Sequence, residues 1–252
     1  MVFNFHRSIY RNLETHNLIF TLVKRTKLIF IDTQIFWLTF HVFILVYWLG
    51  ADISVFYGST QLTNTKNSIE TRLVIVKIIS FVNWFPNIAN ILIFPVGIML
   101  LAGLGYFTEV GKLIYLVWFP FLFWFFFIAG SITQRGTSMG KVYLYLDSLM
   151  RILLISFVYI GISFLYFSDV IFIEDWVLLK FYLYGYILIC GFGIKYSYSG
   201  FAPAFKNLIE NGPSIEIEKK LSASRKMVKP WVLALWLGLV LLSYIGISKP
   251  DF

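Results

Sequence analysis

The chain has 252 residues, of which 59% are hydrophobic and only 13% are charged, and its mean hydropathy is +0.78. Ordinary soluble domains carry about 25% charged residues. The composition therefore excludes a soluble domain and predicts an all-α integral membrane bundle in contact with lipid. The net charge of +8 is typical of loops that meet anionic lipid, so we expect no nucleic-acid partner. The single cysteine excludes an intramolecular disulfide.

Residues 1–33 form a basic N-terminal tail. Its segment Asn17–Ile31 mixes apolar residues with the cluster Lys24-Arg25-Thr26-Lys27, a composition typical of a helix that lies on a membrane surface. A basic flank beside the first span, without a surface helix, is the alternative interpretation.

Six segments are long and apolar enough to cross a hydrocarbon layer of about 30 Å, which requires about 20 residues. The first three form a region over 34–132, and the last three share 133–252 with a polar loop over 200–229. The second segment is longer than the hydrocarbon layer requires, so either its first turns project into the polar region or the helix bends at Pro86. The six predicted spans are Gln34–Tyr57, Leu73–Leu104, Lys112–Ile132, Ser148–Phe167, Trp176–Tyr198 and Trp231–Ile247. Gly136 and Gly140 belong to the predicted break before the fourth span, and Pro230 suits the first turn of the sixth helix.

The orientation of these spans depends on two opposing signals. An even number of spans places both ends of the chain on one side of the membrane. Loops one, three and five carry most of the Lys and Arg, which favours a cytoplasmic location for these loops. The dense basic tail argues for the reverse, so the sequence leaves both orientations open.

The first span contains the only histidine within the predicted spans, His41, which shares a helical face with Trp48 and Asp52. Ionisable residues inside a membrane are costly and indicate a functional site. The alternative for His41 is a hydrogen bond that holds two helices together.

Small residues recur in the same span at intervals of four, at Gly50, Ser54 and Gly58. Such a strip lets another helix approach closely. It is a candidate seam for a homo-oligomer or for a partner in a membrane complex.

The second span carries a polar stripe of its own. If the first two spans form a hairpin, counting from the connecting loop places Asp52 at the depth of Lys77. The two are then predicted to form an intramembrane ion pair. The same count predicts a pocket that contains His41, Trp48, Asn87 and Asn90.

Further charges lie at predicted span edges. Asp147 and Arg151 are four residues apart, which is typical of a local pair on one helix, and Lys195 is expected to extend its amine to the interface. The sequence has no Walker loop, dinucleotide fingerprint or zinc-protease motif. It identifies no catalytic residue, and it leaves open whether the protein is an enzyme.

His41 followed after six residues by Trp48-Leu49-Gly50, then Phe94-Pro95-Val96-Gly97 and Lys112-Leu113, resembles a group of small bacterial membrane proteins. This group includes the CopD-like copper-resistance domain and the HemJ-type protoporphyrinogen oxidases. The similarity covers about residues 34–130. It departs from the HemJ pattern after Tyr57, where Gly58 replaces an arginine, and it shows no histidine at the end of the third span.

The resemblance implies a bacterial inner-membrane protein that binds haem b through His41, in a redox role. In that hypothesis His41 is the metal ligand, Trp48 packs on the macrocycle, and Asn87 or Asn90 bonds nearby. Lys112 matches a family lysine associated with haem binding and activity. The alternative hypothesis is a protein without cofactor that transports a metal ion or protons, or that has a structural or assembly role.

Overall fold

The computed structural model describes residues 33–250. Within that range the chain forms helices and no strand, and six helical segments are long and apolar enough to cross a membrane. The prediction of an all-α multi-pass membrane bundle is therefore confirmed. The predicted tail, with its surface helix over 17–31, lies outside the described residues.

The N-terminal helix is described from Thr33 to Leu62. The second span consists of α2 and α3, the third of η1 and α4, and the fourth of α5, η2 and α6, while the fifth continues from α7 into α8. The elements after the first helix are α2 (Ile69–Val82), α3 (Trp84–Gly103), the 3-10 helix η1 (Thr108–Val117), α4 (Trp118–Thr133), α5 (Ser138–Ser156), the π-helix η2 (Phe157–Ile162), α6 (Ser163–Phe167), α7 (Asp175–Ser197), α8 (Phe201–Asn211) and α9 (Ile215–Ser248).

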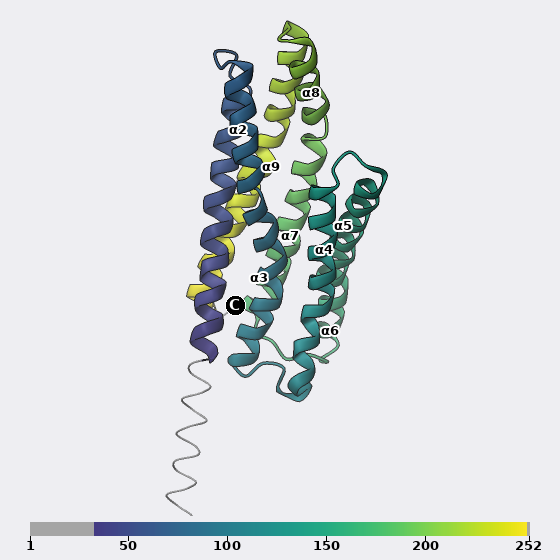
Figure 1. Cartoon of the computed structure of the whole chain (residues 1–252). Helices are drawn as coiled ribbons and strands as arrows, with labels where there is room; N and C mark the ends of the chain where they lie inside the picture. The colour runs from purple at the N-terminus through teal and green to yellow at the C-terminus, as the bar shows by residue number, and fades with distance from the viewer. Residues whose placement is uncertain (1–32, 251–252) are drawn as a thin grey trace, which may run out of the picture.

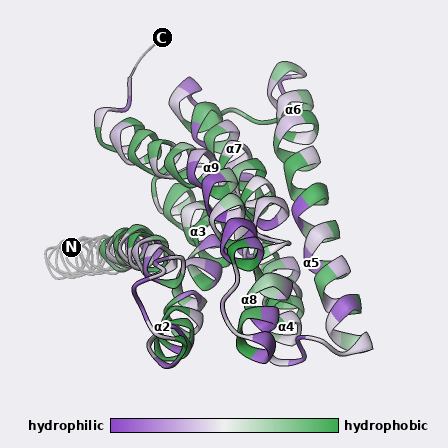
Figure 2. Ribbon diagram, turned by 90° about the horizontal axis from the view of Figure 1, so that it is seen from above, coloured by the Kyte–Doolittle hydropathy of each residue, from purple (hydrophilic) through white to green (hydrophobic). Residues whose placement is uncertain are grey.

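The helices α7 and α9 pack along each other at the centre of the bundle (Figure 1). Seen from above, the N-terminal helix and α2 form one flank, and α4, α5 and α6 form the other (Figure 2). One apolar cluster connects all six spans. Its buried members include Trp48, Phe94, Trp124, Val158, Leu188 and Leu239.

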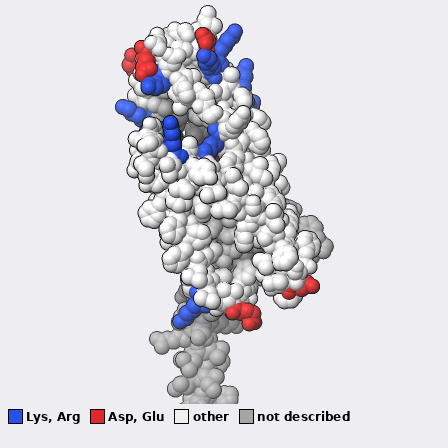
Figure 3. Space-filling model, turned by 90° about the vertical axis from the view of Figure 1, so that its right-hand side faces the viewer, with Lys and Arg blue, Asp and Glu red and all other residues white. Residues whose placement is uncertain are grey.

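The outer surface of the spans is apolar. Large side chains such as Phe43, Phe126 and Ile160 point outward and are more than half exposed, as expected for residues that contact lipid. Charged side chains gather at the two ends of the molecule and leave a broad uncharged band between them (Figure 3). Most Lys and Arg lie at the end formed by α8 and the first half of α9, called the basic end below.

The bend predicted in the second span lies between α2 and α3. Pro86 lacks the N–H that would bond to the carbonyl four residues earlier, which belongs to Val82. Val82 is the last residue of α2, and α3 begins at Trp84. The proline therefore explains why one long apolar segment consists of two helices.

The fourth span begins ten residues earlier than predicted, at Ser138 rather than Ser148. Thr137 caps α5 by accepting a hydrogen bond from the backbone N–H of Gly140 at 3.0 Å. Only glycine fits at position 140 in this first turn, because a Cβ there would lie 2.0 Å from the carbonyl oxygen of Gln134. The sequence analysis took this glycine for part of a break between spans. Asp147 therefore lies nine residues, about 14 Å, beyond the start of α5.

The polar segment 200–229 is helical, although the sequence analysis expected a loop. It forms α8 and the first half of α9, and Pro230 lies within α9 instead of in its first turn. Ser214 caps α9 by accepting from the N–H of Ile217. The buried residues that follow have the spacing of an amphipathic helix, namely Ile217, Leu221, Ser224 and Val228.

These two helices form a cap at the basic end with its own apolar cluster. The N-terminal helix contributes Leu62 to that cluster, and Arg72 of α2 is bound to Glu218 of α9 at 2.8 Å. The other buried members are Phe201, Ala204, Phe205, Leu208, Ile217 and Leu221. The cap therefore holds the ends of four spans together.

Candidate functional site

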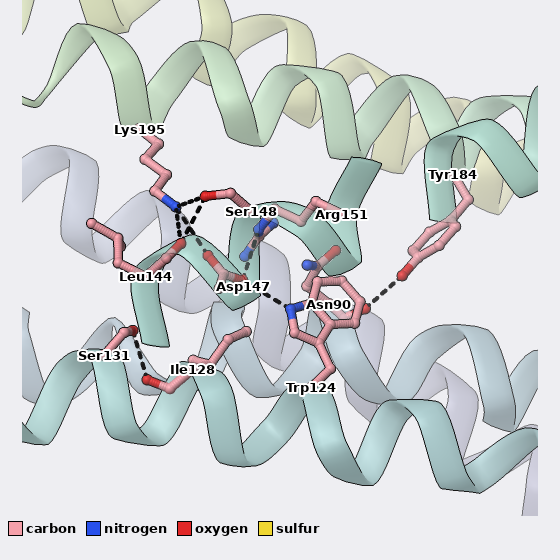
Figure 4. A network of polar contacts seen from close by, with 10 residues as sticks. All are labelled: Asn90, Trp124, Ile128, Ser131, Leu144, Asp147, Ser148, Arg151, Tyr184 and Lys195. Carbon is pink, nitrogen blue, oxygen red and sulfur yellow. Dashed lines mark hydrogen bonds and ion pairs between the residues drawn. The ribbon is translucent and has the colours of Figure 1, made fainter. Parts of the chain in front are cut away.

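A buried carboxylate, Asp147 of α5, is the middle of a polar cluster that joins α4, α5 and α7 (Figure 4). Its Oδ1 accepts from the indole N–H of Trp124 at 2.8 Å and from Nε of Arg151 at 3.0 Å. Its Oδ2 accepts from Nζ of Lys195 at 3.1 Å. These four residues are called the Asp147 centre below.

The two cations of the Asp147 centre are held by further contacts. The guanidinium of Arg151 lies 5.2 Å from the centroid of the Trp124 ring. It also reaches α7, where a Cβ at Gly191 would lie 3.4 Å from its Nη1. Lys195 donates to Oγ of Ser148 at 2.7 Å. Two cations around one carboxylate leave the centre with one excess positive charge.

A second polar contact lies near this centre, between α3 and α7 (Figure 4). The hydroxyl of Tyr184 donates to the backbone carbonyl of Asn90 at 2.9 Å, and both residues are buried. The amide nitrogen of Asn90 is buried without a hydrogen-bond partner. The region therefore contains an unused donor in addition to the excess positive charge.

Polar and small residues continue along one face of α7 towards the other end of the bundle. Lys180, Tyr184, Gly191 and Lys195 are four, seven and four residues apart, which places them on the same side of a helix. We call this the polar face of α7. At its far end, Nζ of Lys180 comes within 2.6 Å of where a Cβ of Gly246 would lie. Among the described residues no carboxylate forms an ion pair with Lys180.

His41 lies near that far end, between the N-terminal helix and α3. Its ring packs against Gly97, where a Cβ would lie 3.5 Å from Cε1. Its Nδ1 is buried and has no hydrogen-bond partner. Asn90 is seven residues from Gly97, about 10 Å along α3. The structure therefore does not place Asn90 beside His41.

The other residues predicted for this pocket are also apart. Trp48 is buried in the main apolar cluster, two turns from His41. The amide of Asn87 donates to the carbonyl of Asn83 at 2.7 Å. Lys112 is exposed in η1, at the end opposite the basic end.

The described residues supply one imidazole as a candidate haem ligand. A second imidazole would have to come from His6 or His16, which lie outside the described residues. Within 33–250 there is no group of three or more His, Cys, Asp or Glu side chains placed to hold a metal ion. Haem b binding through His41 stays a prediction, and the function proposed below does not use it.

Asp52 and Lys77 are not brought together. Oδ2 of Asp52 accepts from the indole N–H of Trp236 of α9 at 2.7 Å. In the described part of the chain, no ion pair contains Asp52 or Lys77. Counting residues from the loop gives the depth of Asp52 along its helix. It does not give the direction of the side chain, which points to α9 and not to α2.

The small-residue strip of the first span packs partly within the chain. A Cβ at Gly58 would lie 2.3 Å from Ile79 of α2, so this glycine permits contact between the first two spans. Nothing lies within 4 Å of a Cβ at Gly50, whose carbonyl accepts from Oγ of Ser54 at 2.9 Å. A seam with a second molecule at these residues stays a prediction.

Trp124, Tyr184 and Trp236 were not predicted as polar partners, and Lys195 was not predicted to bind Asp147. Each of the three aromatic residues stands in a strongly apolar segment that is rich in other aromatic residues. Their single polar atoms carry no distinguishing pattern. The spacing of Lys180, Tyr184, Gly191 and Lys195 was the one signal that could have revealed the polar face of α7.

Comparisons of the chain with protein-family models, with curated proteins and with solved structures find no match. The resemblance to CopD-like and HemJ-type proteins is therefore not tested by them, and it stays a prediction.

Proposed function

We propose that this multi-pass membrane protein transports a small anion along the polar face of α7. The observation that carries the proposal is the charge of the Asp147 centre, where one buried carboxylate faces two cations. An uncompensated charge is costly inside a membrane. A bound anion would neutralise the excess positive charge and remove that cost. The Asp147 centre is therefore expected to attract anions.

The available donors also suit an anion. Only Nε of Arg151 donates to Asp147, and among the described residues the terminal nitrogens of this guanidinium donate to no other group. Guanidinium groups bind oxyanions through two parallel donors. The unpartnered amide of Asn90 is a further donor nearby.

Transport requires a route by which the anion reaches the Asp147 centre and a second binding site towards the other end of the bundle. On the side of α4 and α5, the surface near the basic end is hollowed between Lys and Arg side chains (Figure 3). The side chain of Lys195 is 33% exposed while it binds Asp147, so the centre can be reached from the surface of the protein. At the far end, Lys180 offers a second cation without an acidic partner among the described residues. A positive potential along such a path concentrates anions.

The test is uptake of anions by the purified protein in liposomes. Chloride, phosphate, sulfate and a small carboxylate are each supplied outside, and uptake is compared with that of empty liposomes. We expect saturable uptake of at least one anion. Lys195→Met should reduce this uptake at least about tenfold, because the centre then becomes a neutral Asp147–Arg151 pair that no longer attracts an anion.

The matched control is Lys206→Met on α8. Lys206 is exposed and pairs with Glu210 at 3.6 Å, so this variant removes the same charge away from the path. It should retain the uptake of the unchanged protein. The proposal fails if no anion enters faster than into empty liposomes, or if Lys195→Met and Lys206→Met transport equally well.

A further inference from the structure

Asp52 is a second carboxyl group inside the membrane-spanning part of the bundle, and its surroundings are unlike those of Asp147. Its polar partner is the neutral indole of Trp236. Phe56, one turn further along the same helix, packs edge-on against that indole with a centroid distance of 5.5 Å. The group is therefore enclosed by aromatic surface on the side of α9.

The position of Trp236 in α9 gives the depth of this group. Trp236 is six residues beyond Pro230, about 9 Å along the helix axis. The basic residues Arg225, Lys226 and Lys229 precede this proline, and the sequence beyond it is apolar. Because cations of this kind mark the interface, Asp52 lies within the hydrocarbon layer.

No titratable group on the neighbouring helices forms an ion pair with Asp52 among the described residues. Some of these groups bind other partners. Arg225 of α9 donates to Oγ1 of Thr60 at 2.7 Å and lies over the ring of Phe56. On α7, the helix packed behind Trp236, Tyr186 contacts the thiol of Cys190. Lys77 on α2, Tyr244 on α9 and His41 on the N-terminal helix form no hydrogen bond or ion pair with Asp52 in the described part of the chain.

We propose that Asp52 is a proton-binding site within the membrane, occupied by a proton at neutral pH. An ionised carboxylate without a cation is strongly disfavoured in a hydrocarbon layer. The neutral acid avoids this cost and still accepts the hydrogen bond from Trp236. Its own O–H then becomes a donor that can pass a proton to water or to another acceptor when the helices move.

The proton site suggests how the anion path could be driven, and this step rests on the function proposed above. An inside-negative membrane potential opposes the entry of an anion into a cell. Co-transport with a proton removes this opposition, because the anion and the proton together carry no net charge. Asp52 contacts α9 through Trp236, and Lys180 of the polar face of α7 lies against Gly246 of the same helix. A movement of α9 would therefore affect both sites.

Infrared spectroscopy of the protein in liposomes tests the proton site directly. We expect the carbonyl band of a protonated carboxyl at pH 7, its shift in heavy water, and its absence in Asp52→Asn. Trp236→Phe should move the band to higher frequency, because the carbonyl loses its hydrogen bond. Asp52→Glu should restore a band. The proposal is overturned if the unchanged protein and Asp52→Asn give the same spectrum in this region.

Transport assays then test the coupling separately. Asp52→Asn should retain exchange of one anion for another across the liposome membrane and should lose accumulation driven by a pH gradient. Unchanged accumulation in Asp52→Asn would overturn the coupling. If the unchanged protein moves no anion at all, the proposed function fails, while the infrared result still decides the proton site.

Discussion

Asp147 and Asp52 are two carboxyl groups well inside long apolar helices, and each accepts a hydrogen bond from a tryptophan indole. Trp124 donates to Asp147 at 2.8 Å, and Trp236 donates to Asp52 at 2.7 Å. The environments differ in charge. Asp147 has Arg151 and Lys195 as partners, whereas no ion pair of Asp52 is found among the described residues.

This difference shows how the same side chain can take opposite ionisation states in one membrane protein. A carboxylate beside two cations is stabilised in its charged form. A carboxyl without a cation in a hydrocarbon layer is stabilised in its protonated form, although an indole donor by itself favours the charged form. The neutral donor is common to both sites. The cations therefore decide the charge state, and the predictions below separate their contribution from that of the indoles.

The largest effect is expected from Asp147→Asn. It leaves Arg151 and Lys195 close together and without a counter-charge, which should lower the free energy of unfolding by about 3–5 kcal/mol. Asp52→Asn replaces a neutral acid by a neutral amide of the same shape and should cost less than about 1 kcal/mol. Unfolding of the purified proteins in mixed micelles measures both values.

A double variant checks the explanation for this first prediction. In Asp147→Asn with Lys195→Met, one of the two unpaired cations is gone, so part of the lost stability should return. If the two aspartate variants lose equal stability, the two carboxyls do not differ in charge and the comparison fails.

The indoles give the next largest effect. Trp124→Phe removes a hydrogen bond to a charged group, worth about 1.5–3 kcal/mol, whereas Trp236→Phe removes one to a neutral group, worth about 0.5–1.5 kcal/mol. Both changes remove the same ring atoms. We expect the first variant to be the less stable one in the same unfolding assay. The reverse order would mean that Asp52 carries the charge.

The sequence was sufficient for the fold because span number depends on apolar length, which is a local property. It misplaced boundaries where a local signal was ambiguous. Gly140 was taken for part of a break, although it permits the tight first turn of α5. The segment 200–229 was taken for a loop because it is polar, although the spacing of Ile217, Leu221 and Val228 was available to indicate an amphipathic helix.

The candidate site was less predictable because its contacts join helices that are distant in sequence. Asp147 and Arg151 are four residues apart and were recognised as a pair, but Lys195 comes from α7 and Trp124 from α4. The partner of Asp52 lies 184 residues away, on the last helix. Periodicity shows which face of a helix is polar, but it does not show which other helix covers that face.

A smaller effect concerns Lys77, the partner that the sequence analysis assigned to Asp52. Lys77→Met should change the free energy of unfolding by less than about 0.5 kcal/mol, as for a position outside any network. Combined with Asp52→Asn, the two effects should add, because residues that do not meet are independent. A coupling energy well above about 0.5 kcal/mol would show that the pair exists and that Asp52 is charged.

The smallest effect extends the comparison to a carboxylate in water. Glu174 precedes α7, is exposed, and accepts from the indole N–H of Trp176. This hydrogen bond, followed by one from the hydroxyl of Tyr106, holds the pKa of Glu174 below its ordinary value of 4.5. A lowered pKa means that folding favours the ionised form. Its contribution to stability is therefore present above pH 4.5 and is lost as the pH falls through the lowered value.

Trp176→Phe should raise the pKa of Glu174 towards 4.5, and Tyr106→Phe should raise it less. The midpoint can be followed by the carboxyl carbon resonance of labelled glutamate. Because water competes for this exposed group, neither variant should shift the melting temperature at pH 7 as much as Trp236→Phe does. If the titration midpoint of Glu174 is unchanged in Trp176→Phe, an indole donor alone does not stabilise the ionised form of a carboxyl group. The cations at Asp147 would then account for the whole difference between the two sites in the membrane.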